Sequence, residues 1–195
     1  MKNPKRYTVP YRRKREMKTD YKKRVAYLKS GRNRLVIRKS LKNILGQIVA
    51  FDAKGDKVIA SVSSKELSKM GWSFSNNNMS ASYLSGYMLG VKAAAKNVSD
   101  AILDLGLQST PKGGKLYAFL KGVLDGGVNV PHDDTILPSE ERIKGAHIAN
   151  YAKELKSKDE ASFKKQFSKY VKTSVNTDNI TSQFEEMKNK IKGAK

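Results

Sequence analysis

Cysteine is absent from the 195 residues of this chain. Its absence excludes disulfides, thiolate metal sites and cysteine nucleophiles, and it fits a reducing compartment. Long apolar runs are missing too, since the stretch 44–51 is far shorter than the roughly 20 residues that a helix needs to cross a bilayer. The N-terminus has no apolar signal core, so we expect a cytoplasmic protein with no membrane-spanning segment and no secretion.

Acidic side chains are scarce relative to basic ones. The chain holds 18 Asp and Glu against 39 Lys and Arg, which gives a formal net charge of +21. A compact chain with this charge repels itself unless a polyanion offsets the repulsion. Nucleic acid is therefore the first partner to consider, and an anionic membrane surface is the second.

The basic excess is concentrated near the N-terminus. Residues 1–40 hold 16 basic and 2 acidic side chains, and eight of the nine arginines lie there. Arginine grips phosphate with a planar fork and stacks on bases, and interleaved tyrosines offer faces on which unpaired bases stack. The pattern predicts RNA or DNA binding. The alternative is a solvated basic tail whose tyrosines pack on the domain.

The predicted binding residues are cations and tyrosines of this N-terminal segment. They lie in an arm, in a first helix and in the first strand. The residues are Lys5, Arg6, Tyr7, Tyr11, Arg12, Arg13, Lys14, Arg15, Lys18, Tyr21, Lys22, Lys23, Arg24, Arg32, Arg34, Arg38 and Lys39.

Three regions follow from the changes in composition along the chain. Residues 1–18 contain two prolines and little apolar material, so we expect an extended arm that is disordered until a partner orders it. Residues 19–131 alternate strand and helix signals, as in a globular core. Residues 132–195 show helical segments with narrow apolar stripes, so we expect a helical extension that packs on the core or on a partner.

The core begins with a short helix. Thr19 is its expected N-cap, Tyr21, Val25 and Leu28 form its apolar face, and Gly31 ends it. The strands expected after it cover 34–38, 43–51 and 57–62. A capping box at 63–66 is expected to open a short helix that ends before Gly71. A helix over 79–97, a strand over 101–105 and a helix that begins at Thr110-Pro111 and ends at Gly126-Gly127 are expected next. This β-β-β-α-β-α order predicts an α/β (α+β) fold with a mixed sheet, similar to the ribonuclease-H-like topology.

Two details of the core and three helices of the extension complete the prediction. Gly86 and Gly90 are four residues apart, and we expect close packing of their helix on the sheet. Trp72 and Phe74 are expected to pin a polar loop to the core rather than to touch a ligand. The extension is expected to form helices over 139–156, 160–173 and 179–192.

Catalytic and metal-binding patterns are missing from the sequence. Ribonuclease-H-like nucleases hold metal ions with carboxylates on the first strand and its neighbours, but here that strand carries Arg34 and Arg38 and no acid. Asp104 stands alone on the fourth strand. His132 precedes two aspartates in a proline-containing loop, where adjacent residues rarely aim at one point. We therefore expect no enzyme, no metal site and no cofactor.

Several separate motifs resemble those of one family. They are Thr19-Asp20-Tyr21-Lys22-Lys23-Arg24, Leu28-Lys29-Ser30-Gly31, Arg34-Leu35-Val36-Ile37-Arg38-Lys39-Ser40, Gly71-Trp72, Ala81-Ser82-Tyr83-Leu84-Ser85-Gly86-Tyr87, Gly126-Gly127-Val128-Asn129-Val130-Pro131-His132 and Arg142-Ile143-Lys144-Gly145-Ala146-His147-Ile148. In this order they resemble the large-subunit ribosomal protein of the eighteenth family, in its archaeal and eukaryotic branch. The short chain favours the archaeal side. The likeness covers roughly residues 5–155.

The resemblance implies a structural protein of the ribosome that binds 5S rRNA and attaches it to 23S rRNA in the central protuberance. A neighbouring ribosomal protein of the fifth large-subunit family is the implied protein partner, and the C-terminal extension could contact other large-subunit proteins. Composition by itself indicates only a nucleic-acid binder with a basic arm. A free-standing RNA chaperone or regulator that uses the same arm is the alternative function.

Overall fold

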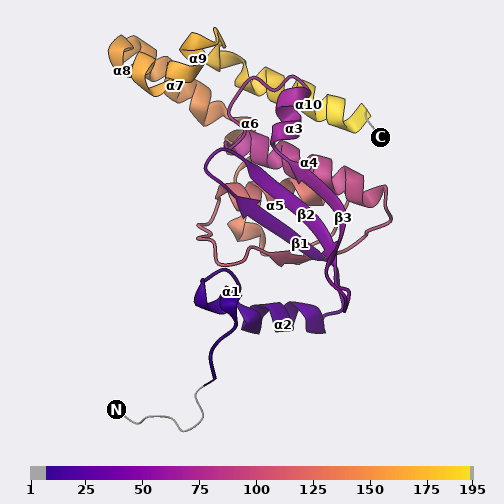
Figure 1. The fold of residues 1–195 in the computed structure, drawn as a ribbon. Helices are drawn as coiled ribbons and strands as arrows, with labels where there is room; N and C mark the ends of the chain where they lie inside the picture. Colours follow the sequence, from indigo (N-terminus) through magenta and orange to yellow (C-terminus); the bar gives the residue numbers. More distant parts are fainter. Residues whose placement is uncertain (1–7, 194–195) are drawn as a thin grey trace, which may run out of the picture.

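A four-stranded mixed sheet organises the computed structural model, which describes residues 8–193 (Figure 1). The strand order is β3-β2-β1-β4. Strand β1 (Arg34–Lys39) pairs antiparallel with β2 (Ile44–Ala50), which pairs antiparallel with β3 (Lys57–Ser63). Strand β4 (Ile102–Asp104) pairs parallel with β1. The expected mixed sheet and element order are confirmed.

The two faces of the sheet differ in chemistry because successive side chains of a strand point to opposite sides. On the inner face, Leu35, Ile37 and Ile48 are fully buried. Helices α4 (Met79–Ala94) and α5 (Lys115–Asp125) cover this face and lie behind the sheet in Figure 1. The outer face of β1 carries Arg34, Val36 and Arg38 instead, and the N-terminal helices lie beside it.

Small residues bring α4 and α5 into backbone contact. A Cβ atom added at Gly86 would lie 2.1 Å from the carbonyl oxygen of Phe119, and one at Gly90 would lie 2.7 Å from that of Val123. Gly122 of α5 faces Tyr83 and Tyr87 of α4 in the same way. The expectation that Gly86 and Gly90 pack on the sheet is therefore wrong. Both glycines face α5, because two helices on one sheet face must also pack against each other.

Residues 8–18 of the expected arm are not extended throughout. Residues Arg12–Arg15 form a helical turn, α1, before helix α2 (Tyr21–Lys29). Asp20, and not Thr19, is the N-cap of α2, since its carboxylate accepts a hydrogen bond from the backbone N–H of Lys23 at 3.1 Å. Gly31 (φ +67°) follows the helix as expected.

The prediction that Val25 lies on the buried face of α2 is wrong. Val25 is 50% exposed, whereas Arg24 and Tyr27 line the cavity between α2 and the sheet. The outer sheet face beside α2 is polar and charged. Ion pairs and hydrogen bonds, rather than burial of apolar side chains, therefore determine which side of α2 faces the sheet.

Three further predictions concern the start of α5, the capping box of α3 and the loop that holds Trp72 and Phe74. The second core helix begins at Lys115 and not at Thr110-Pro111, because residues 111–114 form a turn with Gly113 at φ +64°. The capping box of α3 (Lys65–Lys69) is confirmed in part: Glu66 accepts a hydrogen bond from the Ser63 N–H at 2.9 Å, whereas Ser64 accepts one from Ile44. Trp72 and Phe74 are buried and pin their loop, as expected.

The C-terminal helices are shorter and more numerous than expected. Gly145 (φ +85°) divides the first into α6 (Glu140–Lys144) and α7 (Ala146–Lys158). The second is divided at Phe167 into α8 (Glu160–Gln166) and α9 (Ser168–Lys172). Short 3₁₀ turns, η1 (Asp134–Ile136) and η2 (Thr177–Asn179), precede α6 and α10 (Ile180–Gly193).

Only part of this extension joins the core. Four side chains of α10, those of Ile180, Phe184, Met187 and Ile191, are buried in the same apolar cluster as the sheet. Helices α8 and α9 lie at the far end of the molecule from α1 and α2 (Figure 1). Among residues 8–193, no helix is both long and apolar enough to span a bilayer.

The glycine contact between α4 and α5 generates a stability prediction. Gly86→Ala should lower the free energy of unfolding by about 1–3 kcal/mol, because the added methyl group meets backbone that cannot rotate away. Gly193→Ala is the control, since a Cβ there meets nothing within 4 Å. Urea denaturation followed by circular dichroism measures both. Equal stabilities for the two variants would contradict the close helix contact.

Candidate nucleic-acid interface

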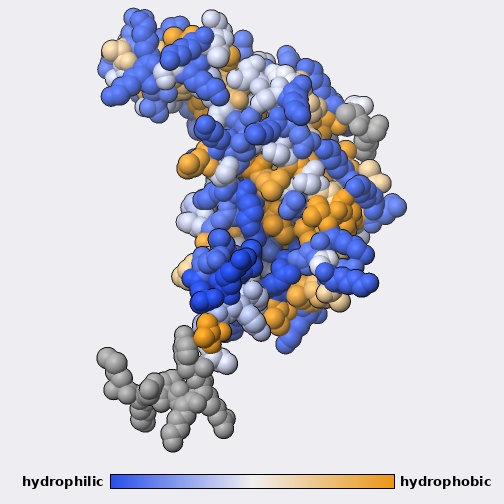
Figure 2. All heavy atoms as spheres, viewed as in Figure 1, coloured by the Kyte–Doolittle hydropathy of each residue, from blue (hydrophilic) through white to orange (hydrophobic). Residues whose placement is uncertain are grey.

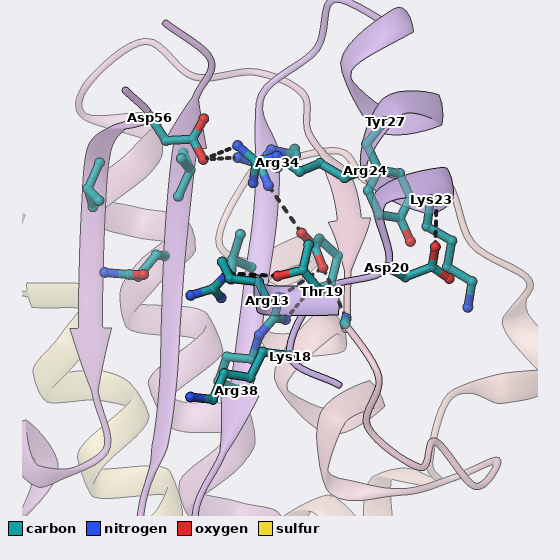
Figure 3. Close-up of a pocket in the computed structure, with 16 residues that line it drawn as sticks. Arg13, Lys18, Thr19, Asp20, Lys23, Arg24, Tyr27, Arg34, Arg38 and Asp56 are labelled. Carbon is teal, nitrogen blue, oxygen red and sulfur yellow. Dashed lines mark hydrogen bonds and ion pairs between the residues drawn. The ribbon is translucent and has the colours of Figure 1, made fainter. Parts of the chain in front are cut away.

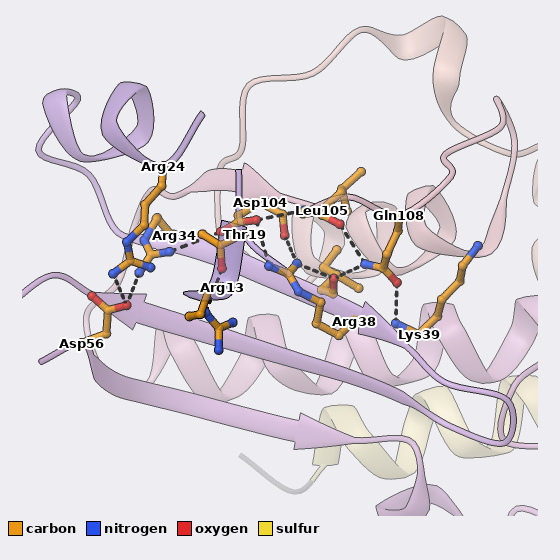
Figure 4. Close-up of polar contacts among 12 residues, drawn as sticks. Arg13, Thr19, Arg24, Arg34, Arg38, Lys39, Asp56, Asp104, Leu105 and Gln108 are labelled. Atoms are coloured by element: carbon orange, nitrogen blue, oxygen red, sulfur yellow. Dashed lines mark hydrogen bonds and ion pairs between the residues drawn. The ribbon is translucent and has the colours of Figure 1, made fainter. Parts of the chain in front are cut away.

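A network of ion pairs covers the outer face of β1. The parallel register places Asp104 opposite Val36, between Arg34 and Arg38. Arg34 Nη1 donates to Asp104 Oδ2 at 3.2 Å, and Arg38 Nη2 donates to Asp104 Oδ1 at 3.0 Å. Arg38 Nη1 also donates to the Asp104 backbone carbonyl at 2.7 Å (Figure 4). Asp104 therefore holds both arginines flat against the sheet.

Asp56 extends this network to α2. It lies just before β3, and its Oδ2 accepts hydrogen bonds from Arg34 Nη2 at 2.6 Å and from Arg24 Nη2 at 2.9 Å (Figure 3). All nine residues of α2 keep part of their side chains exposed. Because α2 buries so little apolar surface, Asp56 is a principal anchor of the helix on the sheet. We call Arg24, Arg34, Arg38, Asp56 and Asp104 the outer-face network.

The charges of the outer-face network shift two pKa values. Partial burial of Asp56 would raise its pKa, but hydrogen bonds from Arg24 and Arg34 and their positive charges outweigh the burial, so the pKa lies below the ordinary value of 3.8. Burial raises the pKa of the Tyr27 hydroxyl, and the charges of Asp104 and Asp20 raise it further. Asp56 is therefore ionised and Tyr27 is neutral near pH 7.

Other cations of the N-terminal segment take no part in this network. Within residues 8–193, the ion pairs of the α1–α2 segment involve Arg12 and Lys18, both with Glu16, and Arg24. Six exposed cations of this segment stand outside those pairs, among them Arg13 and Lys29. The other four, which we call the outward cations, are Lys14, Arg15, Lys22 and Lys23. Figure 2 shows the corresponding strongly hydrophilic surface beside the N-terminal end of the molecule.

The remaining predicted residues occupy a range of environments. Tyr11 is 72% exposed, with its ring centroid 5.1 Å from that of Tyr21. Arg13 donates a hydrogen bond to the Thr19 hydroxyl at 2.9 Å. Lys5, Arg6 and Tyr7 lie outside the described residues.

Three predicted residues beyond α2 make contacts within the protein. Arg32 pairs with Asp100 at 3.3 Å at the surface, and the Lys39 ammonium donates to the Ser109 carbonyl at 3.2 Å. The side chain of Arg34 is only 4% exposed. The structure thus brings the described part of the arm, residues 8–18, together with α2 on one surface and gives Arg34 an internal position.

Sequence reasoning missed Asp56, Asp104 and Gln108. Gln108 Nε2 donates to the carbonyls of Ile37 and Leu105, each at 2.8 Å, and its Oε1 accepts from the Lys39 N–H at 2.8 Å. All three residues are distant from the N-terminal cations in sequence. The one available signal was an acid on a strand beside two arginines of another strand, and the pairing of those strands was needed to read it.

Clustered metal ligands are absent from the described part of the chain: residues 8–193 contain no group of three or more His, Cys, Asp or Glu side chains placed to hold an ion. The ring of His132 contacts the Val130 carbonyl through Nδ1 at 2.7 Å, and its Nε2 lies 3.3 Å from Asp134. Both contacts organise the loop after Pro131.

Replacing Asp56 tests the outer-face network. Asp56→Asn should lower the free energy of unfolding by about 1–3 kcal/mol at pH 7, because two arginines lose a charged acceptor. A depressed carboxyl pKa stabilises the fold above the unfolded value, and this contribution disappears as the pH falls through the folded value. The difference between wild type and variant should therefore shrink below about pH 4 in urea titrations at several pH values.

Asp100→Asn is the matched control, because it removes the partner of Arg32 in an ion pair whose two side chains are about half exposed. Such surface pairs contribute roughly 0–1 kcal/mol. A loss at Asp56 no larger than at Asp100, or a loss that does not change with pH, would contradict the anchoring role.

Comparison with known proteins identifies the family. The family model described as "Ribosomal large subunit proteins 60S L5, and 50S L18" matches residues 5–101 and 91–133. The large ribosomal subunit protein uL18 of Methanococcus maripaludis is 47% identical over 186 residues, which cover 95% of this chain and 96% of the relative. The expected eighteenth family, its archaeal side and the expectation of a structural protein rather than an enzyme are thereby confirmed. The chain belongs to the family of the large-subunit ribosomal proteins 60S L5 and 50S L18.

Proposed function

We propose that this protein binds 5S rRNA and attaches it to 23S rRNA in the central protuberance of the large ribosomal subunit, in the cytoplasm. The observation that carries the proposal is the group of outward cations on α1 and α2, in a chain of this family. Phosphates of an RNA backbone release counterions when such cations bind them, which makes the binding strong and dependent on salt.

The anchoring of α2 supports RNA binding over a loose polycationic tail. Asp20 caps α2, and Asp56 binds Arg24 of the same helix, so Lys22 and Lys23 project from a helix with a defined position. A positioned cation loses less conformational freedom when it binds phosphate. Tyr11 and Tyr21 lie beside these cations and offer aromatic faces to unpaired bases.

The three regions of the chain suggest a division of labour. Residues 1–18 and α2 bind RNA, residues 19–131 form the scaffold, and residues 132–195 contact other proteins. In the extension, Tyr151 and Val171 are 49% and 45% exposed, on helices that project from the core (Figure 1). A ribosomal protein of the fifth family is the proposed neighbour, and other large-subunit proteins could contact α8 and α9.

Removing two outward cations tests the electrostatic part of the proposal. Lys22→Gln with Lys23→Gln should flatten the slope of log affinity for 5S rRNA against log salt by roughly 1–2, about one for each phosphate that the protein no longer neutralises. Fluorescence titrations of the full chain over a range of salt concentrations measure the slope. Lys165→Gln with Lys169→Gln, on the exposed side of α8 and α9, is the matched control. Equal slopes for the two double variants would contradict binding through α2.

Replacing arginines of α1 by lysine tests whether the guanidinium group itself, and not only its charge, contributes to RNA binding. Arg12→Lys with Arg15→Lys keeps the net charge at +21 but removes the planar forks. We leave Arg13 unchanged because it bonds Thr19 within the protein. Affinity for 5S rRNA should fall roughly 5- to 100-fold at fixed salt, while affinity for an unrelated RNA of equal length changes little. No loss on either RNA would show that α1 acts only through its charge, and parallel losses on both would show that its arginines do not distinguish 5S rRNA from other RNA.

A further inference from the structure

A cavity of about 360 Å³ lies between α2 and the outer face of the sheet (Figure 3). Its size falls in the range of pockets that hold small organic ligands, roughly 300–1,000 Å³. The N-terminal segment closes one side of it with Arg13 and Lys18, and α2 closes another with Lys23 and Tyr27. We call this cavity the sheet pocket.

The floor of the sheet pocket is apolar. Val36, Val49 and Val58 line it from three neighbouring strands, and the register places Val49 opposite Val58. Val58 is 51% exposed, although a valine on a strand normally packs against a neighbour. Figure 2 shows hydrophobic atoms exposed over the sheet on this side of the molecule. Val49 is buried, so Val58 supplies most of the exposed apolar surface of the floor, beside the cations that line the cavity.

The walls of the sheet pocket carry groups of two further kinds. Tyr27 presents an aromatic ring with a neutral hydroxyl. Gln47, in β2, presents an amide that both donates and accepts hydrogen bonds, as the edge of a base does. Six cationic and three acidic side chains line the cavity, so its net charge is positive.

The arrangement of the charges indicates what kind of ligand fits. The inner cations, Arg34 and Arg38, are already paired with carboxylates, so a phosphate would find no unpaired cation at the bottom. The cations at the rim come from the N-terminal segment and α2, and Lys23 lies outside the ion pairs of residues 8–193. A ligand that is flat and apolar at one end and anionic at the other matches this distribution. A nucleotide has that character.

We propose that the sheet pocket binds one nucleotide of 5S rRNA that is turned out of its stack, with the base over the valine floor against Tyr27, the base edge at Gln47 and the phosphate at Lys23. Protein recognition of RNA commonly uses such unstacked bases, held by aromatic faces and by hydrogen bonds to their edges. This inference rests on the proposed binding of 5S rRNA and adds the place where a single base is recognised.

Filling the sheet pocket tests the inference. Val58→Trp places a large side chain on the floor at an exposed strand position. We expect a 5- to 100-fold loss of affinity for 5S rRNA at fixed salt, because one stacked base is worth about 1–3 kcal/mol. Leu45→Trp is the matched control, since Leu45 is on the same face of the sheet, 38% exposed, and outside the pocket lining. Circular dichroism confirms that each variant folds.

A second variant removes the edge contact without filling the pocket. Gln47→Ala should lower the affinity roughly 2- to 10-fold, as expected for one or two hydrogen bonds. Ser61→Ala is its control, because Ser61 lies opposite Gln47 in the register, is exposed, and is outside the pocket lining.

Chemical probing with dimethyl sulfate gives a readout that does not depend on affinity. In complexes formed at saturating protein, one base of 5S rRNA should be protected by wild type and by Leu45→Trp, and reactive with Val58→Trp. If Val58→Trp binds as tightly as its control and gives the same protection pattern, the nucleotide proposal is overturned and a protein ligand for the pocket becomes the better hypothesis. If wild type itself does not bind 5S rRNA, the proposed function fails instead.

Discussion

The buried guanidinium of Arg34 is the group on which the outer half of this structure depends. Its side chain is 4% exposed and lies between the carboxylates of Asp56 and Asp104. A charge this deep is stable only when it is paired, because desolvation of an isolated ion costs several kcal/mol. The pairing joins β1 to β4 on one side and to the turn before β3 on the other. Asp56 also accepts a hydrogen bond from Arg24, so the same network positions α2.

The inner half depends on close packing between two helices. Gly86 and Gly90 of α4 let α5 approach until backbone meets backbone, and the pair covers the apolar face of the sheet. The apolar residues of α10 then pack on the same cluster. The core and the last helix of the C-terminal extension therefore share one apolar interior. Helices α8 and α9 contribute little to it, and their exposed surface is consistent with the proposed protein contacts.

The basic excess of the chain divides into two groups with different physical roles. Arg24, Arg34 and Arg38 neutralise internal carboxylates and organise the fold. The outward cations remain on the surface of α1 and α2, where phosphates can reach them. The internal arginines fix the position of the outward cations on α2, because α2 has little apolar surface that could pack on the sheet. Such positioning is what the proposed recognition of an RNA with a defined shape requires, in addition to attraction of any polyanion.

The sequence by itself determined the order of strands and helices, the basic N-terminal segment and the family. These features follow from local patterns: alternating apolar residues from 34 to 62, the capping signal at Glu66, and motifs that keep their order along the chain. The tertiary structure decided that Gly86 faces α5 and that Gly145 interrupts a helix, since both glycines lie against residues that are distant in sequence.

The largest difference between the sequence-based prediction and the structure concerns Arg34 and Asp104. Sequence reasoning placed Arg34 among the RNA-binding residues and found no partner for Asp104, because 70 residues separate Arg34 from Asp104. Only the parallel pairing of β1 with β4 brings them together, and pairing between distant strands leaves no local signal in a single sequence. The sequence therefore determined that the segment is cationic, and the tertiary structure decided which cations are internal. The physical reason is that a charge can be buried only where the fold supplies its counter-charge.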